Sequence, residues 1–252
     1  MSGSVDVRRR AILDRLEAHG RVEVGALSAV LGVTEETIRR DLRALELDGL
    51  LRRAHGGAVR SDLDTDRHPD LRAAAALADR ALTLIDAGSA VFLGGGSACE
   101  ALAARLAPTP GTVLVTGSVP VALAAALADE RAVVHLIGGT ADDHGLLTGA
   151  WAREQLSGLR LDVAVVEALG VTADGRLLHA SPEEAAVVAT AVDLAGSAIL
   201  LVDPETFGAG GLAASVPAGS LATVLLAGDA DPGGLEVLLA TGVRVETIGV
   251  GA

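Results

Sequence analysis

The chain has 252 residues, half of them hydrophobic, with one cysteine and a net charge of −13. This composition excludes a disordered chain and a framework of intramolecular disulfides. No signal peptide opens the chain and no apolar run is long enough to span a bilayer, so we expect a cytoplasmic protein that has no membrane partner.

The charge is unevenly distributed along the chain. Residues 1–60 carry eleven Arg and nine acidic residues, a net charge of +2, whereas residues 61–252 carry −15. Because an acidic surface repels the phosphates of DNA, a contact with DNA is expected only from the N-terminal part.

Residues 1–60 show the periodicity of three short helices. Gly32 stands where the second helix would end in left-handed backbone, and Thr34 is a good N-cap for the third. The apolar positions of the three helices are Ile12, Leu13 and Leu16; Val24, Leu27, Val30 and Leu31; and Ile38, Leu42 and Leu45.

A hairpin is predicted directly after these helices. Residues 50–53 and 58–60 have strand character and flank the turn signal Gly56-Gly57. Three helices followed by a small hairpin is the order of a winged helix-turn-helix, so residues 1–60 are assigned to a DNA-binding domain.

Residues 61–70 are polar and acidic and are interpreted as a linker. In residues 71–252 strand-length apolar runs alternate with Ala-rich helical stretches, which predicts a Rossmann-like parallel α/β domain with both faces of its sheet covered. The expected strands are 90–93, 112–116, 132–137, 162–169, 198–202, 223–226 and 243–250. The expected helices are 71–85, 97–106, 119–128, 150–157, 182–194 and 232–240.

The third helix has the character of a recognition helix. At 100° per residue Glu36, Arg40 and Arg43 point away from the apolar face, and Thr37 and Arg39 flank it. Outward guanidinium groups can pair with guanine edges or phosphates. Any single Arg here is better explained by a solvated helix face, but the combination of cap, spacing, Arg pair and wing favours DNA binding.

Residues 8–59 resemble the DNA-binding domain of the DeoR family of bacterial regulators, most specifically in T-I-R-R-D-L (residues 37–42) followed by R-x-H-G-G-A (residues 53–58). The resemblance implies that the recognition helix faces a double-stranded operator and that His55-Gly56-Gly57 forms the wing. The predicted DNA-binding residues are Thr34, Glu36, Thr37, Arg39, Arg40, Arg43, Arg53, His55 and Gly56.

Residues 71–252 resemble the sensor domain of the same family, which is related in fold to sugar-phosphate isomerases and coenzyme A transferases and typically senses phosphorylated sugars. A Gly-rich loop before a helix can expose N–H groups to an anion, although a plain strand-to-helix turn explains it as well. The predicted effector-binding residues are Gly94, Gly95, Gly96, Ser97, Thr116, Ser118, Gly139, Glu167 and Asp203.

Several positions depart from the family pattern. Gly94-Gly95-Gly96-Ser97-Ala98 replaces Asp-x-Gly-Thr-Thr, Val188 and Ala189 replace basic residues, Glu205-Thr206 replaces Ser-Lys, and Glu167 replaces a glycine. The last three of these changes remove positive charge, or add negative charge, where a phosphate would bind. The hypothesis is that the pocket binds a neutral or cationic ligand, or none, rather than a typical sugar phosphate.

Other interpretations stay open. The chain could be a sugar-isomerase-like enzyme with a fused DNA-binding module, although it has no Lys to stabilise an enediolate, or a DNA-binding protein whose second domain serves only for assembly.

His135, His144 and His179 match no compact metal motif, and no cofactor is expected. Cys99 fits a core residue or, less simply, a redox sensor, and Trp151 is expected to pack. The leading interpretation is a repressor that acts as a homodimer or homotetramer.

Overall fold

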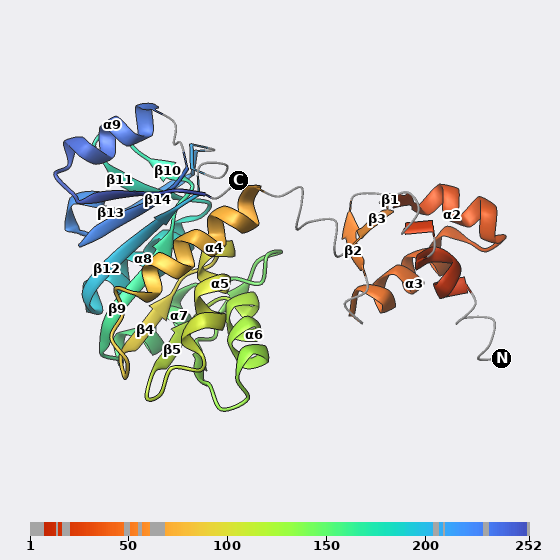
Figure 1. The fold of residues 1–252 in the computed structure, drawn as a ribbon, viewed down its shortest axis with the longest axis horizontal. Helices are drawn as coiled ribbons and strands as arrows, with labels where there is room; N and C mark the ends of the chain where they lie inside the picture. Colours follow the sequence, from red (N-terminus) through yellow and green to blue (C-terminus); the bar gives the residue numbers. More distant parts are fainter. Residues whose placement is uncertain are drawn as a thin grey trace. The chain divides into compact units, whose positions relative to one another are not determined.

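The computed structural model describes residues 8–13, 15–16, 21–47, 51–54, 57–60, 69–203, 207–208, 210–228 and 232–250. Contacts within the chain divide it into two units, residues 1–69 and 70–252 (Figure 1). Each unit has a hydrophobic core of its own.

The first unit is a winged helix-turn-helix, as predicted. Residues 8–13 and 15–16 are helical. They are followed by β1 (Arg21–Glu23), α2 (Val24–Leu31), α3 (Glu35–Leu47), β2 (Leu51–Ala54) and β3 (Gly57–Arg60). Strand β3 pairs antiparallel with both β1 and β2. The sequence did not predict β1, because a three-residue strand has too little periodicity and depends on its pairing with β3.

The core of the first unit is formed by the predicted helix faces, with one exception. Ile12, Leu16, Ile38 and Leu42 are fully buried. Val30, which was expected on the apolar face of α2, is 59% exposed, and that expectation was wrong. At 100° per residue Val30 points roughly 90° away from the mean direction of the other apolar residues of α2.

The second unit is built on a seven-stranded parallel sheet with the order β15-β14-β12-β9-β4-β5-β6. The strands are β4 (Ala90–Leu93), β5 (Val113–Thr116), β6 (Val133–Leu136), β9 (Leu161–Glu167), β12 (Ala195–Val202), β14 (Thr223–Ala227) and β15 (Val245–Ile248). The chain runs outward from β4 to β6 and then returns to place β9 on the other side of β4. The order therefore reverses between β4 and β9, where parallel α/β sheets bind their ligands.

Helices cover both faces of this sheet (Figure 1). The helices are α4 (Pro69–Leu82), α5 (Ser97–Leu106), α6 (Val119–Ala128), α7 (Ala150–Ser157), α8 (Pro182–Leu194) and α9 (Pro232–Ala240). Successive side chains of a strand point to opposite faces, so Val163 and Val165 pack with α4, α5 and α6, whereas Ala164 and Val166 pack with α7, α8 and α9. The parallel α/β prediction is confirmed, and the bounds of α5 to α9 agree with the prediction.

Smaller strands lie beside the main sheet. An antiparallel sheet joins β10 (Gly170–Val171), β11 (Arg176–His179) and β13 (Ala213–Pro217), and β7 (Thr140–Ala141) pairs with β8 (Leu147–Thr148). A short 3-10 helix, η1 (Ala218–Ser220), follows β13. None of these elements was predicted, because they are shorter than the windows in which periodicity is recognised.

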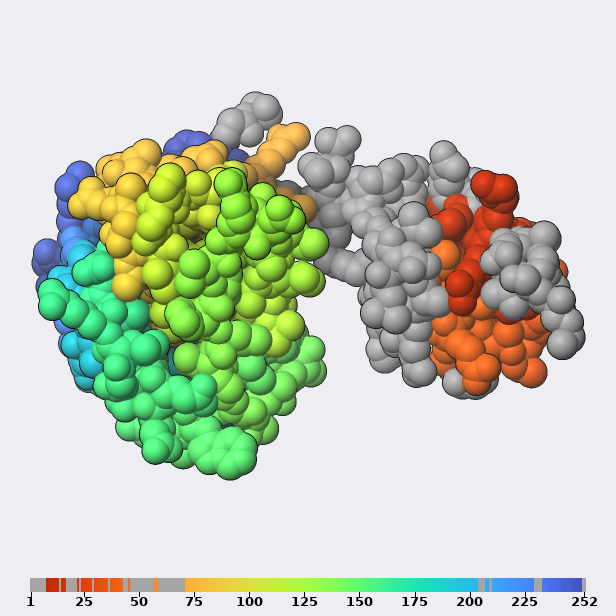
Figure 2. Space-filling view, turned by 90° about the horizontal axis from the view of Figure 1, so that it is seen from below, coloured from red at the N-terminus to blue at the C-terminus, as the bar shows by residue number. Residues whose placement is uncertain are grey.

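The start of α4 and the packing of Trp151 are among the expectations that differ from the structure. The linker was expected to reach residue 70, but α4 begins at Pro69, and a proline is favoured at the first helical position because its missing N–H has no helical partner there. Trp151 was expected to pack but is 73% exposed near the start of α7. Part of the surface is also apolar along α6, where Val119, Leu123 and Leu127 are exposed at intervals of four residues. Figure 2 shows the second unit from one side, with the surface near residue 125 in light green.

Candidate functional site

Helix α3 carries the candidate DNA-binding face. Ile38, Leu42 and Leu45 are buried against the core of the first unit, and Arg40 on the other side of the helix is exposed. Within the described residues Arg40 has no hydrogen-bond or ion-pair partner. An exposed guanidinium group at this position can donate hydrogen bonds to a base edge or a phosphate.

The start of α3 is held by its own side chains. The N–H of Thr37 donates to the Thr34 hydroxyl at 3.3 Å, and the two hydroxyl groups lie 2.9 Å apart, so Thr34 caps the helix as predicted. Arg39 is exposed and pairs with Glu35 one turn earlier, at 2.7 Å. This pair would have to open, or be shared, for Arg39 to contact DNA.

A buried acidic residue fastens α3 to the first helix. Asp41 is only 2% exposed and accepts hydrogen bonds from Arg8 at 2.5 Å and Arg9 at 3.5 Å. This contact could not be predicted from the sequence, because Asp41 lies in the recognition motif but 33 residues from Arg8. Two N-terminal arginines thus orient the helix rather than extend its basic face.

The remaining predicted DNA contacts lie outside the described part of the chain. The backbone of α3 includes Glu36 and Arg43, and β2 includes Arg53, but these three side chains are not described. His55 and Gly56 fall between β2 and β3, outside the described residues. All five stay predictions.

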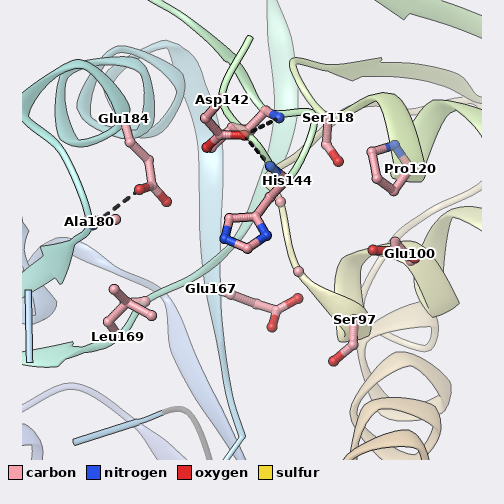
Figure 3. A pocket seen from close by; sticks show the side chains of 14 residues that line it. Ser97, Glu100, Ser118, Pro120, Asp142, His144, Glu167, Leu169, Ala180 and Glu184 are labelled. Atoms are coloured by element: carbon pink, nitrogen blue, oxygen red, sulfur yellow. Dashed lines mark hydrogen bonds between the residues drawn. The ribbon is translucent and has the colours of Figure 1, made fainter. Parts of the chain in front are cut away.

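The second unit has a cavity of about 460 Å³ where β4 and β9 end, at the reversal of strand order. Its wall comes from the loop after β4, the start of α5, the segment before α6, the β7–β8 hairpin, the end of β9 and the start of α8 (Figure 3). The lining residues are Gly95, Gly96, Ser97, Glu100, Ser118, Pro120, Asp142, His144, Leu146, Glu167, Ala168, Leu169, Ala180 and Glu184.

Five of the nine predicted effector-binding residues line this cavity. They are Gly95, Gly96, Ser97, Ser118 and Glu167.

The other four predicted residues lie nearby but outside the lining. Gly94 lines a small adjoining cavity of about 20 Å³. Thr116 is fully buried and accepts a hydrogen bond from the N–H of Ser118. Gly139 packs so closely on Thr148 that a Cβ would lie 2.3 Å from its carbonyl oxygen, and Asp203 is buried after β12.

Glu167 is the central acidic group of the cavity. The backbone N–H of Cys99, in the first turn of α5, donates to Glu167 Oε1 at 2.8 Å. Burial raises the pKa of Glu167 to about 7, the charge of Asp203 acts in the same direction, and the hydrogen bonds from Cys99 oppose both. Burial also raises the pKa of Glu100, one turn into the same helix.

Four polar residues of the cavity were not recognised as effector-binding residues from the sequence: Glu100, Asp142, His144 and Glu184. Asp142 accepts from the N–H groups of His144 and Leu146, both at 2.9 Å, and so shapes the loop between β7 and β8. Glu184 accepts from the N–H of Ala180 at 3.1 Å. Loops carry no periodicity, so nothing in the sequence marked Asp142 and His144 as neighbours of Glu167.

A fully buried histidine stands behind Glu184. His179 Nε2 lies 2.8 Å from the Ser215 hydroxyl, and its Nδ1 lies 3.5 Å from Glu184 Oε1. This arrangement connects the cavity wall to β13 and the small antiparallel sheet. The Ser215 hydroxyl is buried and does not line the cavity, so His179, Ser215 and Glu184 do not form a nucleophilic triad. Instead, His179 and Ser215 hold Glu184 in place.

The described part of the chain has neither a cluster of metal-ligating side chains nor a membrane-spanning helix. No group of three or more His, Cys, Asp or Glu side chains in that part of the chain converges as metal ligands would. None of its helices is long and apolar enough to cross a bilayer.

Comparison with known proteins agrees with both halves of the structure. Residues 8–63 match the family model of the DeoR-like helix-turn-helix domain, and residues 71–226 match that of the DeoR C terminal sensor domain. The lactose phosphotransferase system repressor of Lactococcus lactis is 31% identical over 79% of this chain and 82% of its own length. The glycerol-3-phosphate regulon repressor of Escherichia coli is 27% identical over 80% and 82%.

Solved structures show more distant similarity. A D-ribose-5-phosphate isomerase matches with a TM-score of 0.41 and 20% identity, covering 56% of each chain. A probable sor operon regulator from Shigella flexneri matches with a TM-score of 0.41 and 15% identity over 74% of this chain and 87% of its own. The two family models cover the winged helix and most of the second unit, and this chain belongs to the DeoR family of transcriptional regulators.

Proposed function

We propose that this protein is a transcriptional repressor that binds a double-stranded operator through α3 and the β2–β3 wing, and that a small metabolite in the cavity of the second unit controls this binding. The observation that carries the DNA-binding part is the exposed Arg40, which has no partner among the described residues, on a helix whose opposite face is buried. A regulator of this kind acts on the chromosome, in the cytoplasm.

The charge distribution supports the same division of roles. The acidic second part of the chain, with its net charge of −15, is unsuited to DNA, whereas residues 1–60 are weakly basic. The alternative of an isomerase-like enzyme is disfavoured by the cavity, because no Lys or Arg lines it among the described residues. Such an enzyme needs a cation to stabilise an enediolate.

A homo-oligomer is part of the proposal. One winged helix contacts only a few base pairs, so two copies on two half-sites supply the affinity and the spacing that an operator needs. The exposed apolar face of α6 is the surface that we assign to contact between copies, since apolar patches of this kind mark interaction sites. Light scattering should show a dimer or tetramer. Leu123→Glu should weaken this assembly, whereas Leu212→Glu, which changes an exposed leucine elsewhere, should leave it intact.

The proposed function is tested by a mobility-shift assay with DNA from upstream of the protein's own gene. The assay uses two salt concentrations and a random duplex as competitor. A shift that resists the competitor and weakens with salt supports a specific regulator. The proposed function would be contradicted if random DNA abolished the shift as effectively as the upstream DNA does, both with and without extracts of small metabolites.

A further inference from the structure

The cavity of the second unit is lined by an excess of negative charge. Four carboxylates line it, those of Glu100, Asp142, Glu167 and Glu184, and His144 is the one basic side chain among the described lining residues (Figure 3). Because these groups do not converge as metal ligands would, their spacing suits an extended organic group better than a metal ion. The rest of the wall is largely apolar.

Three helices begin at this cavity, and each is already capped by an acceptor of the chain. The N–H of Cys99 in α5 donates to Glu167, that of Val121 in α6 donates to Ser118 at 3.3 Å, and α8 begins with a Ser181 cap. Free N–H groups at helix starts are what attract a phosphate. Here the protein's own oxygen atoms take this role, so little is left to recruit an anion.

At the start of α5, the oxygen atoms that take the place of a phosphate are those of Glu167. Gly96 has a φ of +121° and stands immediately before α5, and a Cβ on it would lie 2.3 Å from the carboxyl carbon of Glu167. The carboxylate therefore fills the space over the glycine, where a bound phosphate would approach the backbone. A phosphate could enter only by displacing Glu167 or by lying against it.

Glu100 adds a carboxylate without a partner. It is half-buried on the cavity side of α5, and within the described residues its side chain has no hydrogen bond or ion pair. A partly desolvated charge of this kind is stabilised by a cation and is destabilised by an anion.

We propose that the effector is a small organic cation and that the Glu167 carboxylate occupies the anion position at the start of α5 in place of a phosphate. This inference rests on the proposed function, since it names the class of ligand that the sensor cavity takes. Glu100 and Glu167 bind the positive group, and Pro120, Leu146 and Leu169 contact the carbon framework of the ligand.

The test compares three probes that share one carbon framework and differ in charge: glucosamine, glucose and glucose 6-phosphate. Titration calorimetry of the full-length protein should give the highest affinity for glucosamine, a lower affinity for glucose and the lowest for glucose 6-phosphate. Thermal unfolding should show stabilisation that decreases in the same order. Glu100→Gln should weaken glucosamine binding about tenfold, as expected for one charge-assisted hydrogen bond. Glu154→Gln, at an exposed glutamate of α7 outside the cavity, is the matched control and should have no effect.

A second variant tests the role of Glu167 separately. Glu167→Gly frees the N–H groups of α5, and this variant should gain stabilisation by glucose 6-phosphate that the natural protein lacks. The proposal is overturned if glucose 6-phosphate binds the natural protein as tightly as glucosamine does, if glucosamine does not bind, or if Glu100→Gln binds it unchanged. The mobility shift of operator DNA without ligand is measured on the same preparation. If only the ligand class is wrong, the shift is still seen, whereas if the proposed function is wrong, the shift is lost.

Discussion

The carboxylate of Glu167 lies directly over Gly96, at the point where the chain passes from β4 into α5. A Cβ on residue 96 would lie 2.3 Å from Glu167 Oε1 and 2.5 Å from Oε2, distances at which one group must move. The Glu167 carboxylate can therefore occupy this position only because residue 96 has no side chain. Together they decide what can approach the start of α5.

Gly96→Ala should destabilise the second unit because it adds this steric clash to an unfavourable backbone conformation. Gly149 is the matched control: it also precedes a helix, its φ is +101°, and nothing lies within 4 Å of a Cβ placed on it. We expect Gly149→Ala to cost about 1 kcal/mol from backbone strain alone, and Gly96→Ala to cost about 2–3 kcal/mol more. Urea unfolding measures both. Equal losses in the two variants would show that Glu167 moves away freely.

Glu167 should make stability depend on pH. Its pKa is raised from 4.5 to about 7 in the folded protein, so the folded state keeps a proton that the unfolded chain releases between these values. Stability from this group is therefore greatest below about pH 4.5 and decreases as the pH rises towards 7. Glu167→Gln has no proton to lose and should gain up to about 3 kcal/mol on the natural protein between pH 4 and pH 8.

The measurement is urea unfolding of the two proteins across this range of pH. Groups that titrate equally in both proteins cancel in the difference between their free energies of unfolding. A difference that stays constant with pH would rule out a raised pKa at Glu167.

Asp41→Asn should destabilise the first unit and leave the second unchanged. The substitution removes the charge that Arg8 and Arg9 face at a buried position, which we expect to cost about 1.5–3 kcal/mol. Glu35→Gln removes the exposed ion pair with Arg39 on the same helix and should cost less than about 1 kcal/mol. Calorimetry that resolves the two units tests this, and similar losses for both variants would be the contrary result.

Arg40 and Arg53 should affect DNA binding in different ways. Arg40→Ala should weaken specific binding by about 1–3 kcal/mol if Arg40 contacts a guanine. Arg53→Ala should weaken binding to every sequence alike and lower the slope of log affinity against log salt by about 1. Arg160→Ala, at an exposed position in the second unit, controls for the change in net charge. Unchanged affinity in both variants would remove the assignment of the recognition helix and the wing.

Much of the fold could be predicted from the sequence because helices and buried strands leave local patterns. Ile38, Leu42 and Leu45 recur at helical spacing and are buried as that spacing requires. The apolar runs at residues 90–93 and 223–226 are strands of the parallel sheet. Val30 shows the limit of this argument, since an apolar residue at the edge of a helix face is buried only if a neighbour covers it.

The sequence by itself determined the two-part organisation, the winged helix, the parallel sheet and the family, because these rest on local spacing and on motifs read in order. Only the tertiary structure decided which residues share the cavity. Glu167 and Cys99 are 68 residues apart and meet because the sheet places β9 beside β4. Asp142 and Glu184 join them from a loop and a helix start, where no periodic pattern operates and only the strand order sets the position.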